Sequence, residues 1–262
     1  MSTQPDPLPA AARPGRTTLA RPAYVTRALD QLERISAEGQ RRVLRPVRPV
    51  SEHHHVALPD GRVVVDFASN DYLGLRRHRA LVEAAARGAA DWGTGAGASR
   101  LITGSSPLHE EVETALAQLH GAQRALVTSS GYAANVATLS TLAALEGATF
   151  FSDELNHASI IDGARLARAD VAIWRHGDLD HLAHRLAETA GPTLVVADTV
   201  FSMDGDLLDV DGVVALCRDH GSLLVLDEAH AVLGLDPAPE AFEGIDVVRV
   251  GTLSKTLGAL GG

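Results

Sequence analysis

The fold of this chain is decided by residues 223–258, LLVLDEAHAVLGLDPAPEAFEGIDVVRVGTLSKTLG. This stretch contains two short apolar runs, Leu223–Leu226 and Val247–Val250, and each has the length of a buried parallel strand. Because ligands bind beyond the carboxyl ends of the strands in open α/β sheets, we expect the polar residues that follow both runs to face one pocket. These residues are Asp227, His230, Thr252, Ser254 and Lys255.

Lys255 is the only lysine in the chain, whereas the other 22 of the 23 basic residues are arginines. A lysine kept where arginine serves every other basic position indicates chemistry that a guanidinium cannot perform. An amine can lose its proton and form a Schiff base with an aldehyde, and a guanidinium cannot. Lys255 is therefore the first candidate for a catalytic residue.

Composition limits the function classes. With 262 residues, 45% apolar and 21% charged, the chain is typical of a globular protein with a full core. A net charge of −10 argues against a general surface for nucleic acid or anionic membranes. The single Cys217 excludes an internal disulfide and a cysteine-based zinc site, and no apolar run is long enough to span a bilayer. We expect a cytoplasmic protein.

The N-terminal part is expected to be separate from the main domain. Residues 1–20 are rich in Pro, Ala and Arg and predict a disordered tail, and residues 21–60 predict a helix over Tyr24–Gly39 followed by a basic linker. The triplet at positions 53–55 is three histidines, but adjacent residues of an extended segment point to opposite faces, so a solvated turn is favoured over a metal site. Residues 61–262 predict one large α/β domain.

Strand and helix patterns alternate through this domain. This alternation predicts a mainly parallel sheet with helices on both faces. Ser106 and Glu110 predict a capping box at the start of a helix that runs to His120, whereas residues 101–104 do not read as helical. Besides the two runs above, strands are predicted at Val63–Phe67, Ala125–Thr128, Thr149–Ser152, Val171–Trp174 and Thr193–Ala197, and helices at Tyr132–Leu145, Asp178–Glu188 and Val213–His220.

The sequence does not support three other nucleotide-binding or catalytic motifs. Gly93, Gly95 and Ala98 fit a dinucleotide fingerprint, but a helical pattern precedes them where a strand is required. Residues 227–230 spell the DEAH box of a helicase, yet no lysine precedes Lys255 to form the phosphate loop that a helicase needs. The chain also lacks the G-x-S-x-G elbow of one hydrolase class.

The remaining polar groups together match the requirements of pyridoxal 5′-phosphate (PLP). Residues 128–133, TSSGYA, form a strand end, a turn and a helix start, where free N–H groups favour a phosphate. Asp227 can keep a pyridine nitrogen protonated, and His157 can contact a planar ring. Asp198, Ser202 and Asp204 follow another strand, where turn chemistry and a polar role at the pocket are equally favoured.

Several stretches resemble the α-oxoamine synthases, which are PLP enzymes of fold type I. They occur in family order over residues 60–262, and jointly they are specific although each is short. The stretches are SNDYLGL (69–75), GAGASRLITG (95–104), PLHEEVE (107–113), SSGYAAN (129–135), NHASIIDGAR (156–165), DTVFSMDGD (198–206), VLDEAH (225–230) and GTLSKTLGALGG (251–262).

The resemblance implies a role for each site residue. Lys255 would hold the cofactor covalently and act as the proton-transfer base. Asp227 would pair with the pyridine nitrogen, His230 with the ring hydroxyl, and His157 would stack on the ring. Ser202 would bind near the ring, Asn70 and Arg21 would contact substrate, and Ser130, Gly131, Tyr132 and Thr252 would hold the phosphate.

The resemblance also implies a reaction, partners and a missing segment. An amino acid condenses with an acyl thioester, releasing CO2 and the thiol. The overall pattern is most similar to the branch that uses L-alanine and a pimeloyl thioester, and Ser254 favours that branch or the serine palmitoyltransferases. Family members are homodimers, and the loop at 93–100 would enter the partner's site. The resemblance implies that the family continues well beyond the position of Gly262 into a C-terminal domain, so we expect either a gene model that is cut short or a fragment. Open alternatives are another family branch and an inactive fold that only pairs with another subunit.

Overall fold

The computed structural model describes residues 22–50, 54–143 and 147–262. The described residues fall into two compact units, one of residues 22–50 with 55–64 and the other of residue 54 with 65–143 and 147–262. The predicted tail at 1–20, Arg21 and His53 lie outside the described residues, as does the end of the helix predicted to reach Leu145.

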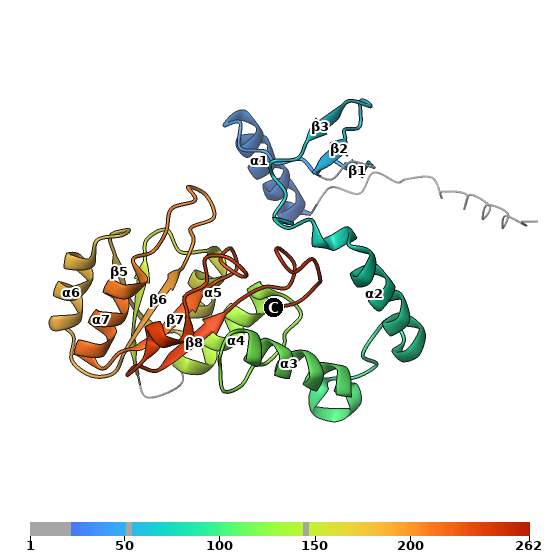
Figure 1. The fold of residues 1–262 in the computed structure, drawn as a ribbon. Coiled ribbons are helices and arrows are strands. Elements are labelled where there is room, and N and C mark those ends of the chain that lie inside the picture. The colour runs from blue at the N-terminus through green and yellow to red at the C-terminus, as the bar shows by residue number, and fades with distance from the viewer. Residues whose placement is uncertain (1–21, 51–53, 144–146) are drawn as a thin grey trace, which may run out of the picture. The chain divides into compact units, whose positions relative to one another are not determined.

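The first unit contains a helix and a small sheet (Figure 1). Helix α1 (Ala23–Ala37) confirms the predicted N-terminal helix, and its apolar residues, such as Leu32, remain exposed. Strands β1 (Arg48–Pro49), β2 (His55–Ala57) and β3 (Val63–Val65) form a three-stranded sheet in that order, with β1 antiparallel to β2.

The second unit begins with helical segments. They are η1 (Leu75–Arg77), α2 (Arg79–Trp92), the π-helical turn η2 (Arg100–Gly104) and α3 (Pro107–Leu119). Two expectations were wrong in detail. Residues 101–104 are helical, because the Gly104 N–H reaches back to the Ser99 carbonyl at 3.0 Å in a wide turn. The reciprocal cap of α3 uses His109 and not Glu110, since His109 Nδ1 accepts the Ser106 N–H at 3.1 Å.

A parallel five-stranded sheet follows, with strand order β5-β4-β6-β7-β8. It confirms the predicted class and every predicted strand from residue 149 onward. The elements in chain order are α4 (Gly131–Ala143), β4 (Thr149–Asp153), α5 (Ala158–Ala167), β5 (Asp170–Trp174), α6 (Leu179–Ala187), β6 (Thr193–Asp198), α7 (Val210–His220), β7 (Leu223–Asp227), η3 (Pro239–Phe242) and β8 (Val247–Val250).

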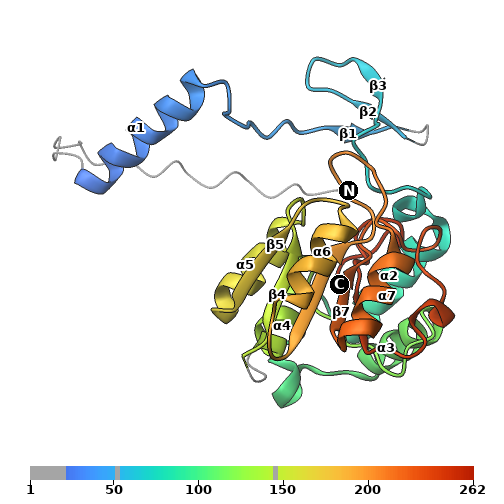
Figure 2. The same cartoon turned by 90° about the vertical axis from the view of Figure 1, so that its left-hand side faces the viewer.

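Helices cover both faces of this sheet (Figure 2). Val195 and Ala197 of β6 pack on the face of α6 and α7, whereas Leu194 and Val196 pack on the face of α4 and α5. Every residue of β6 is buried, as expected for a central parallel strand. The alternation of side chains along one strand thus produces two apolar cores from a nearly continuous apolar run.

The strand predicted at Ala125–Thr128 is wrong for the structure described, in which these residues form no strand. Thr128 exchanges backbone hydrogen bonds with Gly262, at 2.7 and 3.1 Å. The neighbouring Val127 N–H donates to the Glu113 carboxylate at 2.9 Å, and Arg100 binds both Glu113 and the Val127 carbonyl. Side chains therefore replace strand partners along this segment.

No helix among the described residues is long and apolar enough to cross a membrane. Because β4, β6, β7 and β8 are parallel, the residues after each of them emerge at one edge of the sheet. The segments that carry His157, Ser202, Asp227, His230, Thr252 and Lys255 begin at this edge.

The packing of α5 on the sheet predicts that substitutions at two neighbouring residues lower the stability by different amounts. Ile160 is 1% exposed against the core between α4, α5 and the sheet, whereas Ile161 is 39% exposed. We expect Ile160→Ala to lower the free energy of unfolding by about 2–5 kcal/mol and Ile161→Ala by less than about 1 kcal/mol. Urea unfolding of both variants measures this, and equal costs would contradict the assigned faces of α5.

Candidate active site

Lys255 lies at the start of a chain of hydrogen bonds. Its Nζ is 2.6 Å from His230 Nε2, and His230 Nδ1 is 2.6 Å from the Tyr72 hydroxyl, which donates to Asn70 Oδ1 at 3.2 Å. Burial, together with the charge of Lys255, lowers the pKa of His230 to about 4. His230 is therefore neutral near pH 7, so one ring nitrogen accepts and the other donates. This direction agrees with a chain from the ammonium to Asn70.

Burial also lowers the pKa of Lys255, although the carboxylates Asp227 and Asp198 oppose the shift. Desolvation disfavours the charged ammonium, which makes the free amine more accessible. A partly buried amine of this kind is suited to attack an aldehyde. The predicted role of Lys255 thus has a physical basis in its surroundings.

Asp227 is buried at the end of β7, and its two oxygens have different donors. Oδ1 accepts the Ala229 N–H at 2.9 Å, and Oδ2 accepts an N–H of the Asn135 amide at 2.5 Å. Asn135 comes from α4, so the helix and the strand end are joined at this point. Sequence reasoning did not single out Asn135, although it lies in the SSGYAAN stretch.

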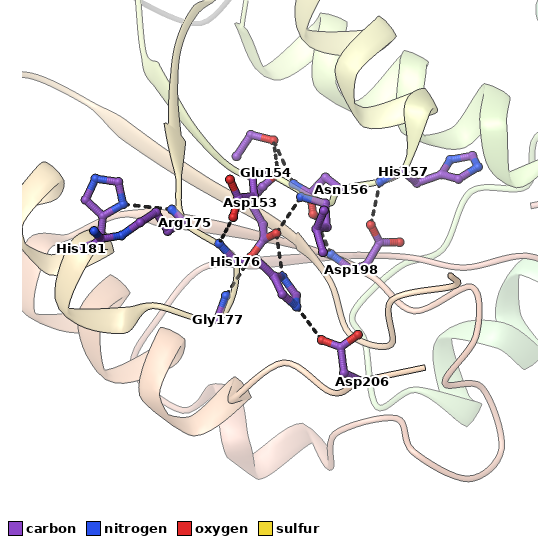
Figure 3. Close-up of polar contacts among 12 residues, drawn as sticks. Asp153, Glu154, Asn156, His157, Arg175, His176, Gly177, His181, Asp198 and Asp206 are labelled. Carbon is purple, nitrogen blue, oxygen red and sulfur yellow. Dashed lines mark hydrogen bonds and ion pairs between the residues drawn. The ribbon is translucent and has the colours of Figure 1, made fainter. Parts of the chain in front are cut away.

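His157 stands at the N-terminus of α5, close to a second buried carboxylate (Figure 3). Its backbone N–H donates to Asp198 Oδ2 at 2.8 Å, while the Asp198 N–H donates to Asn156 Oδ1 at 3.1 Å. Burial, together with the nearby charge of Asp227, raises the pKa of Asp198 to about 7. Asp198 is therefore part of the site and not only of a turn.

The N-terminus of α4 forms a narrow cradle with the turn after β8. Ser130 Oγ accepts the Ala133 N–H at 3.1 Å, and the N–H groups of Gly131 and Tyr132 have no acceptor among the described residues. A Cβ on Gly131 would lie 3.1 Å from Cβ of Thr252, so only glycine fits without a shift. The cradle is lined by backbone donors and a hydroxyl, which suits an anion.

Other predicted residues lie apart from this cluster. Ser202 is exposed, and Asn70 reaches the cluster only through Tyr72. The Tyr132 hydroxyl points to Asp162 at 2.7 Å, so only its backbone faces the cradle. Tyr72 and Ser159 were missed, although both lie in the stretches that carried the resemblance.

Arg249, in strand β8, anchors the loop after His230. Its guanidinium pairs with the buried Glu228 at 2.8 Å and donates to the carbonyls of Pro237 and His120 at 3.1 and 2.9 Å. Burial raises the pKa of Glu228 to about 7, while Arg249 opposes that shift. Glu228 thus serves to hold the loop and is not exposed to the site.

His176 clamps the loop at 199–208 to the end of β4 (Figure 3). Nδ1 is 2.9 Å from Asp153 Oδ1, Nε2 is 2.5 Å from Asp206 Oδ2, and the ring meets Phe201 edge-on at 4.4 Å. Burial alone would lower the pKa of His176, but the two carboxylates outweigh it and the pKa is raised. When the ring is protonated, it donates from both nitrogens, one to each carboxylate.

Comparison with known proteins identifies the class. A family model described as aminotransferase class I and II matches residues 62–262, and the chain belongs to this family. An 8-amino-7-oxononanoate synthase from Burkholderia mallei is 48% identical over 238 residues, which cover 87% of this chain and 60% of that relative. The chain therefore spans about 60% of the length of the curated relative.

Solved structures agree with the predicted resemblance to α-oxoamine synthases and with fold type I. A serine palmitoyltransferase variant from S. paucimobilis with a bound PLP–myriocin aldimine has a TM-score of 0.81 at 28% identity, covering 92% of this chain and 65% of that one. An 8-amino-7-oxononanoate synthase from Francisella tularensis has a TM-score of 0.61 at 28% identity, covering 74% and 56%.

The clamp predicts a pH-dependent contribution to stability. Because the folded pKa of His176 is raised, its contribution is complete below about pH 6.5 and is lost as the pH rises through the folded value. We expect His176→Asn to cost roughly 1–3 kcal/mol at the acid end and less as the pH rises. Urea unfolding at several pH values measures the difference.

The control is His184→Asn, since His184 is exposed and pairs only with Glu188 at 3.5 Å. The His184→Asn substitution should change the free energy of unfolding little at any pH. If the free energies of unfolding of the wild-type chain and His176→Asn differ by the same amount at every pH, His176 contributes by packing and not by charge.

Proposed function

We propose that this chain forms the cofactor-binding part of a PLP-dependent α-oxoamine synthase. The observation that carries the proposal is the partly buried Lys255 amine, which contacts His230 beside the buried carboxylate of Asp227. Residues on β7 and after β8 bring these three groups to one edge of the sheet. The relatives named 8-amino-7-oxononanoate synthase support this class.

The residues present fit PLP. The Gly131 and Tyr132 N–H groups, with Ser130 and Thr252, offer donors for a phosphate at the start of the 13-residue helix α4. Asp227 is a carboxylate that can face a protonated pyridine nitrogen, and Lys255 is an amine that can bind the aldehyde carbon. Phosphate, ring nitrogen and aldehyde each have a chemically matched partner.

When bound, PLP supplies an electron sink for a carbanion beside the amino group of the substrate. The chain's own residues then hold and move protons. Lys255 would carry the cofactor and later accept the substrate α-proton on Nζ. Asp227 would keep the ring nitrogen protonated, His230 would bind the ring hydroxyl, and His157 would cover the ring face.

The remaining roles follow from the same proposal. Ser202 would hydrogen-bond near the ring, and Asn70 would lie near the substrate. Arg21, outside the described residues, would bind substrate as well. The roles of Ser202 and Asn70 rest on the stretches DTVFSMDGD (198–206) and SNDYLGL (69–75).

The proposed reaction joins L-alanine to a pimeloyl thioester, carried by coenzyme A or a carrier protein, and releases CO2 and the thiol. The 48% identity to an 8-amino-7-oxononanoate synthase supports this choice. We also propose a cytoplasmic homodimer in which the loop at 93–100 serves the partner's site. Leu101, next to that loop, is 94% exposed, as this arrangement requires.

A serine palmitoyltransferase-like activity is the second candidate. It is favoured by the structural likeness, with a TM-score of 0.81 against 0.61 for the 8-amino-7-oxononanoate synthase from Francisella tularensis. A third possibility is an inactive fold that pairs with another subunit. The identity of the accepted amino acid and thioester separates these candidates.

The cofactor assignment predicts a visible absorption band and a covalent PLP adduct on one residue. PLP added to the chain should give a visible absorption band that borohydride abolishes, and peptide mapping should place the label on Lys255. Lys255→Arg should abolish the reducible band, because a guanidinium cannot form the bond. The neighbouring variant Ser254→Ala should keep it. A reducible band that persists in Lys255→Arg would contradict the assignment of Lys255 as the residue that binds PLP.

The substrate assignment predicts a preference. We expect CO2 release from L-alanine with pimeloyl-CoA to exceed that from L-serine with palmitoyl-CoA by at least about tenfold, equivalent to roughly 1.4 kcal/mol. Thiol release measures both reactions. The reverse preference would favour the serine palmitoyltransferase-like reading, and PLP binding without turnover of either pair would favour the pairing subunit.

A further inference from the structure

The two groups proposed to contact the ring, His157 and Asp227, are linked by a buried amide and a buried hydroxyl. Asn135, on the second turn of α4, is 2% exposed, and Ser159, near the start of α5, is fully buried. Asn135 Nδ2 lies 2.5 Å from Asp227 Oδ2 and 2.9 Å from Ser159 Oγ. Ser159 Oγ lies 2.6 Å from His157 Nδ1.

The direction of this chain is determined by the donors available. An amide nitrogen has two N–H groups, and Asn135 uses one on Asp227 and one on Ser159. Asn135 Oδ1 is buried without a hydrogen-bond partner among the described residues. Turning the amide over would lose both donations and would bring Oδ1 against the Asp227 carboxylate, so the observed orientation is the one that the carboxylate requires.

The His157 ring accepts a hydrogen bond at Nδ1. The Ser159 backbone N–H, whose direction is fixed by the peptide plane, donates to Nδ1 at 3.2 Å. A nitrogen that accepts carries no proton, so the proton of the neutral ring is on Nε2. Since Nδ1 then has no hydrogen to give, the Ser159 hydroxyl, which accepts from Asn135, donates to Nδ1 in the 2.6 Å contact.

We propose that Asn135 and Ser159 are positioning residues that orient Asp227 and hold His157 as the neutral Nε2–H tautomer. The use of these groups on a pyridine ring rests on the proposed function, whereas the tautomer itself does not. A neutral His157 places no second positive charge against a protonated ring nitrogen. A fixed Asp227 keeps its remaining lone pairs available for that nitrogen. Both effects favour the charged ring on which the cofactor's chemistry depends.

The tautomer is measured on the chain without PLP. Long-range ¹H–¹⁵N spectra of protein labelled in its histidine rings show which nitrogen is protonated, and His157→Gln assigns the signal. We expect an unprotonated Nδ1 and a protonated Nε2 in the wild-type chain. A proton on Nδ1 would overturn the proposal, whatever the variants do.

Variants of Ser159 distinguish a role in positioning His157 from a role in packing. Ser159→Ala should give a mixture of tautomers, and Ser159→Thr, which keeps the hydroxyl, should restore the single form. Ser140→Ala removes a hydroxyl from another place on α4 and should leave the His157 signal unchanged. An unchanged signal in Ser159→Ala would contradict the role of Ser159.

Asn135 is tested through cofactor affinity. Loss of a hydrogen bond to a charged group predicts that Asn135→Ala weakens PLP binding by roughly tenfold or more, whereas Ser140→Ala leaves it unchanged. Unchanged affinity in a folded Asn135→Ala chain would refute its role. If the wild-type chain binds no PLP, the proposed function fails, and the tautomer result still decides the hydrogen-bond chain.

Discussion

The site depends on two carboxylates that parallel pairing places side by side. The register of β6 against β7 puts Asp198 opposite Asp227, and both side chains are about 4% exposed. Two buried like charges disfavour each other, and this is why the pKa of Asp198 rises to about 7 through burial and the charge of Asp227. The surroundings must therefore provide donors and positive charge at this point.

Those donors come from elements far apart in the chain. The His157 N–H at the start of α5 binds Asp198, while Asn135 from α4 and the Ala229 N–H bind Asp227. Lys255, after β8, adds a nearby positive charge that opposes the rise of the Asp198 pKa. The carboxylates thus organise the ends of two helices and the turns after two strands, and the same groups present the candidate cofactor site.

Outside this centre, charged clusters hold the connecting loops. His176 joins Asp153 to Asp206, and Arg249 joins the buried Glu228 to the loop after His230. Both clusters bind residues of loops that follow strand ends, where backbone groups have no ladder partners. Side-chain hydrogen bonds replace those partners, so the loops near the site are fixed without regular secondary structure.

The sequence by itself determined the parallel sheet and its strands from residue 149 onward, and it singled out Lys255 as the candidate catalytic residue. Buried parallel strands are short apolar runs with polar ends, and this pattern is local. Only the tertiary structure showed that Asn135 and Ser159 link His157 to Asp227, or that Ala125–Thr128 forms no strand in the structure described. A hydrogen bond between residues 92 positions apart, as between Asn135 and Asp227, depends on how helices pack on the sheet, and no local pattern encodes that distance.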